Sequence, residues 1–238
     1  MTKNRFVVPT RPNKNIDNDD DLAIIILGSN VPYTMKTYGP KQLLPTKFGC
    51  CLLEHQIDVI SSLYKESELI VVLGYEIDKI LKKKPRARII ENQLFETTCE
   101  AEQLRLAMNS TDKKNLLIIS GDLFFNDEAL SFNRKKTCIL SSNEEKNKNE
   151  IGVSVDQDKV LYLSYDSKEI KWNNIIFIHE RHYGSLQTIT HNRDNSVLYM
   201  SEIINTMLEK DTPIQNYTNN YSIAHKIDTS ADIGILLK

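Results

Sequence analysis

The chain has 238 residues and is nearly neutral, with 30 Lys and Arg against 32 Asp and Glu. This length fits one α/β domain better than two small ones. The charge balance gives no general electrostatic basis for nucleic-acid binding. We expect neither a signal peptide nor a membrane-spanning stretch, and so a cytoplasmic protein that has no membrane partner.

The chain begins with a polar segment that shows no periodicity. We expect residues 1–20 to form a mobile N-terminal arm and residues 21–238 a single domain. A continuous apolar run at 22–27 is typical of a central parallel strand that is covered on both faces. After a loop at 28–47 that contains several prolines, apolar residues at helical spacing predict a helix over 51–63.

Strands and helices continue to alternate up to residue 120. The further predicted elements are strands at 69–74, 88–91 and 116–120 and helices at 76–83 and 99–108. This alternation predicts right-handed βαβ units and a parallel sheet. We expect the apolar runs 22–27, 69–73 and 115–120 to lie at its centre.

After residue 122 the pattern changes to consecutive strands. The predicted elements are strands at 137–142, 151–155, 160–164 and 172–179, a hairpin turn at 156–159 and a helix at 198–208. The fold class that these elements predict is α/β, with a Rossmann-like mixed, mainly parallel sheet flanked by helices.

Two acidic residues, Asp122 and Asp228, occupy positions that suit a metal ligand. Asp122 follows the apolar run 115–120 through Gly121, and open α/β sheets bind ligands just past the carboxyl ends of their strands. Mg²⁺ prefers oxygen ligands and commonly bridges protein to substrate phosphates. Either residue also fits the N-cap of a helix, and both interpretations stay open at this point. In the metal role, Asp122→Asn is expected to abolish turnover and to leave thermal stability nearly unchanged.

A series of short motifs accompanies these two residues. They are Pro-Lys-Gln-Leu-Leu-Pro at 40–45, Leu-Leu-Glu-His-Gln-Ile-Asp at 52–58, Val-Val-Leu-Gly-Tyr at 71–75, Asn-Gln-Leu-Phe-Glu-Thr-Thr at 92–98, Gly-Asp at 121–122 and Ile-Asp-Thr-Ser-Ala-Asp at 227–232. In this order the motifs resemble those of the nucleotidyltransferases that activate sugar-1-phosphates or phosphocholine, which have a GT-A-type fold. The resemblance spans residues 22–235.

The resemblance implies a function and a set of site residues. The implied reaction transfers a nucleotidyl group from a nucleoside triphosphate to a sugar phosphate or phosphocholine-type acceptor and releases pyrophosphate. Asp122 and Asp228 would hold Mg²⁺, and Lys41 would be the catalytic residue that contacts the phosphates, although it also fits a surface lysine between prolines. The implied nucleotide-binding residues are Leu27, Gly28, Lys36, Lys41 and Gly121.

The glycine-rich signature loop of that family, Ala-Ala-Gly-x-Gly-x-Arg, is altered in this chain. Residues 28–34 read Gly-Ser-Asn-Val-Pro-Tyr-Thr, so Asn30 and Pro32 replace the two glycines and Thr34 replaces the arginine. Proline removes an amide donor, and threonine lacks the positive charge that would stabilise the transferring phosphate. We therefore predict weakened turnover, with Lys36 as the nearest substitute cation. The alternative is a catalytically inactive homologue that acts as a binding, regulatory or structural subunit with a protein partner.

Other conspicuous side chains fit structural roles. His55 and His225 lack the partner spacing of a metal site, and we expect Trp172 and Tyr162 to pack against the sheet. The basic cluster at 82–88 fits the solvated end of a helix or, alternatively, an anion-binding patch.

Overall fold

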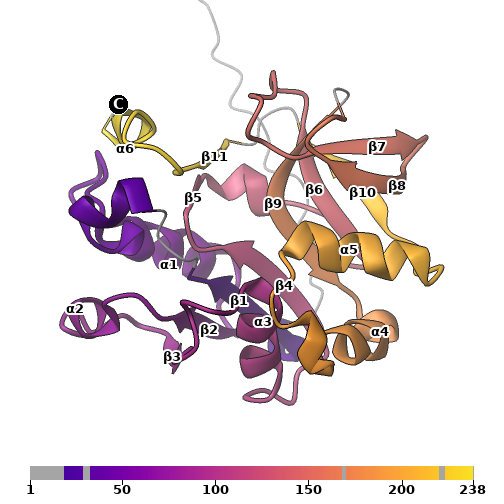
Figure 1. Ribbon diagram of the computed structural model, residues 1–238, viewed down its shortest axis with the longest axis horizontal. Helices are drawn as coiled ribbons and strands as arrows, with labels where there is room; N and C mark the ends of the chain where they lie inside the picture. The colour runs from indigo at the N-terminus through magenta and orange to yellow at the C-terminus, as the bar shows by residue number, and fades with distance from the viewer. Residues whose placement is uncertain (1–18, 29–32, 168–169, 220–222, 238) are drawn as a thin grey trace, which may run out of the picture.

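The computed structural model describes residues 19–28, 33–167, 170–219 and 223–237. The described residues form a main sheet in the strand order β3-β2-β1-β4-β9-β6-β10-β8-β7 and a small sheet of β5 and β11 (Figure 1). The strands are β1 (Leu22–Leu27), β2 (Glu68–Leu73), β3 (Arg88–Glu91), β4 (Asn115–Ser120), β5 (Leu123–Phe125), β6 (Cys138–Ser142), β7 (Gly152–Asp156), β8 (Lys159–Ser164), β9 (Ile170–Ile178), β10 (Gln215–Thr218) and β11 (Ala224–Lys226).

Helices cover both faces of the main sheet. They are α1 (Leu52–Leu63), α2 (Ile77–Leu81), α3 (Glu100–Met108), α4 (Glu180–His191), α5 (Met200–Glu209) and α6 (Ile233–Leu236), with short 3₁₀ helices η1 (Asp19–Asp21), η2 (Tyr33–Tyr38), η3 (Lys41–Leu43), η4 (Asp127–Leu130) and η5 (Arg193–Asn195). Within the described ranges, every helix is too short or too polar to span a membrane.

The first half of the sheet confirms the predicted parallel core. β1 pairs in parallel with β2 on one side and β4 on the other, and all six of its residues are buried. Ala23 and Ile25 pack in one core cluster with α3, α4 and α5, whereas Ile24 and Ile26 pack in a second cluster with α1 and α2. Because successive strand residues point to opposite faces, this continuous apolar run fills both cores.

The second half of the sheet differs from the prediction. β9 runs antiparallel between β4 and β6, and β7 pairs back onto β9, so the last five strands in the order close a ring. Antiparallel pairings predominate in this half, and only β6 and β10 are parallel. The predicted mixed sheet with flanking helices is confirmed, but the description "mainly parallel" is wrong here, because the long strand β9 returns along β4.

Several local predictions are also corrected. The helix predicted over 76–83 is shorter in the structure, where α2 spans Ile77–Leu81. It starts after Glu76 because this residue has a left-handed backbone, with φ 49°. α4 was not predicted. Trp172 is buried as expected, whereas Tyr162 on β8 is 50% exposed. Residues 1–18 of the predicted arm lie outside the described residues.

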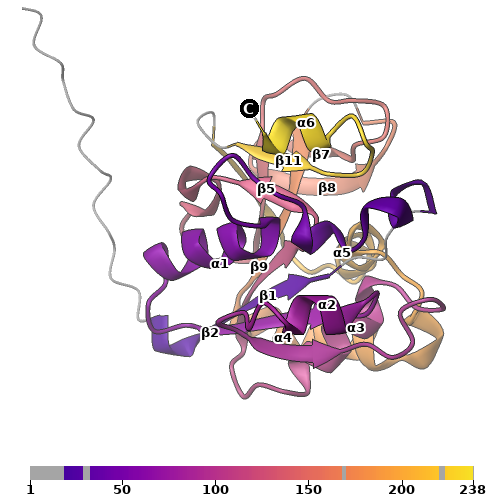
Figure 2. The same cartoon turned by 90° about the vertical axis from the view of Figure 1, so that its left-hand side faces the viewer.

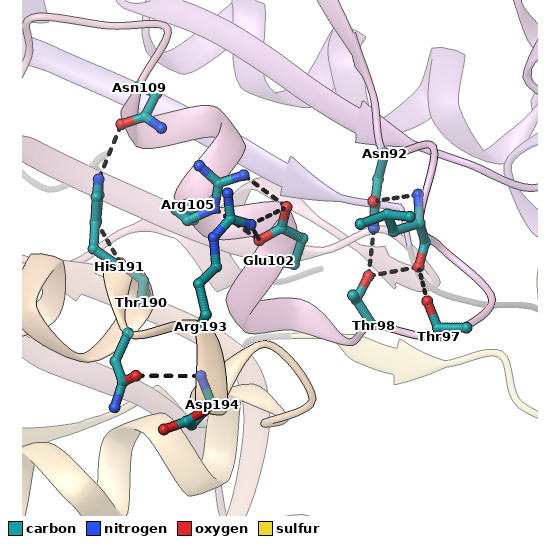
Figure 3. Close-up of polar contacts among 12 residues, drawn as sticks. Asn92, Thr97, Thr98, Glu102, Arg105, Asn109, Thr190, His191, Arg193 and Asp194 are labelled. Atoms are coloured by element: carbon teal, nitrogen blue, oxygen red, sulfur yellow. Dashed lines mark hydrogen bonds and ion pairs between the residues drawn. The ribbon is translucent and has the colours of Figure 1, made fainter.

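Polar contacts hold α3 against the end of α4 (Figure 3). The buried carboxylate of Glu102 accepts two hydrogen bonds of 2.7 Å from Arg105 on the same helix and lies 3.5 Å from Arg193 in η5. The ring of His191 pairs with Asn109 at 3.0 Å. These contacts fix α3, which begins at Glu100.

Candidate active site

The ends of β1 and β4 form one edge of the sheet. Leu27 at the end of β1 is in register with Val72 of β2 and Ser120 of β4. Because the three strands are parallel, the residues that follow them all emerge at this edge. It is the position at which open α/β sheets bind ligands.

Two glycines pack closely at this edge. A Cβ on Gly28 would lie 2.4 Å from the carbonyl oxygen of Val72, and one on Gly121 would lie 2.6 Å from that of Leu27. The amide of Gly28 donates to Val72 and that of Gly121 donates to Leu27. These two amides are thus used within the sheet, and the glycines serve a close approach of the two strands.

Lys41 joins the two candidate carboxylates. Its ammonium nitrogen, Nζ, lies 3.0 Å from Oδ2 of Asp122 and 2.9 Å from Oδ1 of Asp228, and its side chain is only 1% exposed. Lys41 begins η3, directly after Pro40. The structure therefore brings together three residues that lie 81 or more positions apart in the sequence, and it places Lys41 in the interior instead of on the surface.

Backbone contacts fix the two carboxylates relative to one another. The amide of Ile227, immediately before Asp228, donates to the backbone carbonyl of Asp122 at 2.9 Å. β5, which begins after Asp122, pairs antiparallel with β11, and the two strands lie with α6 on the side of the molecule away from α3 and α4 (Figure 2). The side chain of Gln56 in α1 donates to the carbonyl of Leu123 at 2.7 Å.

A small apolar cluster packs the three segments together. It contains Met35 and Leu44 on either side of Lys41, Phe124 two residues after Asp122, and Ile227 one residue before Asp228; its other buried members are Leu52 and Leu236. Burial of each large side chain contributes about 1.5–3 kcal/mol. Such contacts offset the several kcal/mol that withdrawing each charged group from water costs.

The N-cap interpretation fits neither aspartate. Oδ1 of Asp122 accepts a hydrogen bond of 2.7 Å from the hydroxyl of Ser120, and Oδ2 is bound to Lys41. The N-cap of η4 is Asn126, whose side chain accepts from the amide of Ala129. Near α6, the amide of Asp228 donates to the side chain of Asp232, so Asp232 is the residue that accepts from the backbone there.

Sequence reasoning missed two charged members of the site. Lys226, the last residue of β11, places its ammonium 3.0 Å from Oδ2 of Asp228. Glu100 accepts a hydrogen bond of 2.6 Å from the amide of Met200, and its charge interacts with those of Lys226 and both aspartates. The sequence offered one signal for Lys226, namely its position two residues before Asp228. Alternate residues of an extended segment point to the same face, so Lys226 could have been expected beside Asp228.

The charges perturb one another strongly. Burial alone would raise the pKa of Asp122, but Lys41 and Lys226 outweigh it, together with the hydrogen bonds from Ser120 and Lys41, and hold this pKa well below its usual range. Burial would lower the pKa of Lys226, but Asp122 and Asp228 outweigh it and raise that pKa above its usual value. For Glu100, burial raises the pKa of the carboxyl. The site therefore keeps Asp122 ionised and Lys226 protonated at neutral pH.

The donor set can be tested against Mg²⁺. Across the described residues, no group of three or more His, Cys, Asp or Glu side chains is placed to hold a metal ion. Mg²⁺ is, however, usually held by one or two carboxylates together with substrate phosphates and waters. Asp122 and Asp228 fit that pattern, on the condition that Lys41 leaves the position between them.

Lys36, the candidate substitute for the signature arginine, lies apart from this cluster. It is exposed, in the last turn of η2, and its ammonium is 5.9 Å from the ring centroid of Tyr75. Asn30 and Pro32 lie outside the described residues, as does the side chain of Thr34.

The Asn-x-x-Phe-x-x-Thr motif forms a closed turn before α3 (Figure 3). The side-chain amide of Asn92 donates to the hydroxyl of Thr98 at 3.1 Å, and its oxygen accepts from the amide of Leu94 at 3.0 Å. The ring of Phe95 covers Gly74, where an added Cβ would lie 2.3 Å from the Phe95 Cβ. Phe95 thus closes the turn against Gly74 through apolar contact.

Comparisons with known proteins give no sequence match, either to a family model or to a curated protein. Solved structures do match. The CTP:phosphocholine cytidylyltransferase of Streptococcus pneumoniae is 17% identical with a TM-score of 0.75, and the match covers 91% of this chain and 97% of that chain. The inositol-1-phosphate CTP transferase of T. maritima is 14% identical with a TM-score of 0.73, covering 88% and 90%.

A third match is the nucleoside-diphosphate-sugar pyrophosphorylase of Vibrio cholerae, which is 13% identical with a TM-score of 0.69 and coverage of 90% and 99%. At this level of identity the matches establish architecture. The resemblance read from the motifs is thereby confirmed for the fold: this chain has the fold of the sugar-phosphate and phosphocholine nucleotidyltransferases.

Proposed function

We propose that this protein is a nucleotidyltransferase. It would transfer a nucleotidyl group from a nucleoside triphosphate to a small phosphorylated acceptor of the sugar-phosphate or phosphocholine type, with release of pyrophosphate. One observation carries the proposal. Lys41, Asp122 and Asp228 converge from three distant segments at the ligand-binding edge of a fold that is shared with such enzymes along nearly the whole chain.

Each residue has a role that follows from its charge and position. Lys41 would bind the phosphates and neutralise the charge that develops on them, while Asp122 and Asp228 would hold Mg²⁺. Mg²⁺, when bound, supplies positive charge that stabilises the transferring phosphate. Gly28 and Gly121 would support the site through the close approach of the strands, since their amides are already used within the sheet.

The proposed reaction needs no nucleophilic side chain. An acceptor phosphate oxygen forms a bond to the α-phosphorus while the bond from that phosphorus to the pyrophosphate oxygen breaks. Catalysis of such a step rests on positioning and electrostatic stabilisation, which a buried cluster of fixed charges can provide. A protein that consumes nucleoside triphosphates in this way is expected in the cytoplasm.

The proposal is tested by measuring pyrophosphate release. Each of the four common nucleoside triphosphates is incubated with Mg²⁺ and either a panel of sugar-1-phosphates or phosphocholine. The expected result is slow, Mg²⁺-dependent release that requires one nucleotide and one acceptor class and is lost in Asp122→Asn. Lys79→Gln is the matched control, because Lys79 forms an exposed ion pair with Glu76 and should not affect release.

Two results would change the conclusion. Nucleotide binding without any release would favour the alternative, an inactive homologue with a binding or regulatory role. Neither binding nor release with any nucleotide would overturn the proposed function itself.

A further inference from the structure

The carboxylate pair in the site already holds a cation that belongs to the protein. The Lys41 ammonium lies between one oxygen of Asp122 and one oxygen of Asp228, at 3.0 and 2.9 Å. A single ion bound by the same two oxygens would have to occupy the same position. A divalent metal and the Lys41 ammonium therefore exclude one another there.

The remaining oxygens of the pair are also engaged. Oδ1 of Asp122 accepts from Ser120 at 2.7 Å, and Oδ2 of Asp228 is 3.0 Å from the ammonium of Lys226. All four carboxylate oxygens thus have a protein donor. A metal held between Oδ2 of Asp122 and Oδ1 of Asp228 must break the charge-assisted hydrogen bond from Lys41 at each carboxylate, and such bonds are about twice as strong as neutral ones.

The two aspartates are also matched by cations of the protein. Lys41 and Lys226 face Asp122 and Asp228, and the burial of Lys41 and Asp122 makes an added charge costly there. A divalent cation brought in alone would add two positive charges beside these two lysines. A polyphosphate brought in with the metal supplies the missing negative charge, and its oxygens offer Lys41 a new partner.

We propose that Lys41 acts as an internal counter-ion that closes the metal site, so that the protein takes up divalent metal only together with a polyphosphate. The inference rests on the proposed function for the nature of the polyphosphate, but it concerns the order of binding. Lys41 would exchange its carboxylate partners for phosphate oxygens, and the metal would enter as the ammonium moves away. The free protein would consequently bind metal weakly.

The experiment measures Mn²⁺ uptake by the purified protein from the loss of the free-ion electron paramagnetic resonance signal, with the metal alone. Wild type is expected to show no saturable uptake in the micromolar range. Lys41→Gln is expected to bind Mn²⁺ about tenfold to a hundredfold more tightly than wild type. This gain corresponds to the free energy of one hydrogen bond to a charged group. Adding Asp122→Asn to this variant should remove the gain.

Lys226→Gln is the matched control. It removes one ammonium from Asp228, as Lys41→Gln does, but it leaves Lys41 between the two carboxylates. It should therefore gain clearly less affinity than Lys41→Gln. Equal gains in the two variants would show that only the net charge matters, and this would overturn the inference.

A measurement on wild type keeps the inference testable if Lys41→Gln does not fold. Inorganic tripolyphosphate is added as the probe, and the metal that co-elutes with the protein in gel filtration is quantified. Uptake that appears only with tripolyphosphate supports the inference. Tight uptake of Mn²⁺ alone that is lost in Asp228→Asn, or no uptake even with tripolyphosphate, overturns it. None of these arms depends on turnover, so failure of the inference can be told from failure of the proposed reaction.

Discussion

Asp122→Asn should destabilise the protein measurably, even though Asp122 caps no helix. The sequence alone predicted little change in stability for this variant. In the structure, Asp122 is buried and pairs with the ammonium of Lys41, so the substitution removes a negative charge beside a buried positive one.

The size of the effect follows from the partners that remain. Breaking a buried ion pair outright costs about 3–5 kcal/mol. Here Lys41 keeps Asp228 at 2.9 Å, and the new amide can turn its oxygen toward Lys41 while its nitrogen donates to the hydroxyl of Ser120. The loss then approaches that of one hydrogen bond to a charged group, about 2–3 kcal/mol. In a chain of this length that lowers the melting temperature by about 4–12 °C.

The assay is thermal unfolding followed by circular dichroism, without metal or nucleotide. Asp228→Asn is the comparison, because the Asp228 side chain is 34% exposed and solvent replaces part of what it loses. Its destabilisation should be clearly smaller than that of Asp122→Asn. A melting temperature for Asp122→Asn within error of wild type, or a larger loss in Asp228→Asn, would refute the assigned ion-pair geometry.

Three further predictions concern the loop, the sheet edge and pH. Replacing Asn30 and Pro32 by glycine and Thr34 by arginine should raise the rate of pyrophosphate release by about a hundred- to thousand-fold, because one hydrogen-bond donor to the transition state typically has an effect of this size. Turnover by the wild-type protein at ordinary metabolic rates would contradict the interpretation of the loop as impaired. Gly121→Ala should lower the melting temperature, because its Cβ would lie 2.6 Å from a carbonyl oxygen of β1, and an unchanged melting temperature would show that the strands can separate. Burial and neighbouring positive charges lower the pKa of His182 in the folded protein. Its contribution to stability is therefore present above the unfolded-state pKa of about 6.5, and it is lost as pH falls through the lower pKa of the folded state. His182→Gln should flatten the urea-unfolding stability curve between these pKa values, and an unaltered pH slope would refute the assignment.

The parallel core could be predicted from the sequence because its signal is local. Runs such as 22–27 and 116–119 are apolar without interruption, and such a run is typical of a strand covered on both faces. α4 was missed for the opposite reason: only Leu186, Ile189 and Thr190 of its twelve residues are buried, so its periodicity is weak. The direction of β9 was equally hidden, since an apolar strand carries no mark of which neighbour it will join.

The sequence by itself determined which residue types are available at the site. The ordered motifs identified Lys41, Asp122 and Asp228, and the loop at 28–34 showed which expected groups are missing. The tertiary structure decided how these residues meet. It placed Lys41 between the two aspartates and added Lys226 through the pairing of β11 with β5. The physical reason is that ionic contacts between distant segments depend on which segments pack together, here through the apolar cluster around Met35. The choice of packing partner leaves no periodic pattern in the sequence.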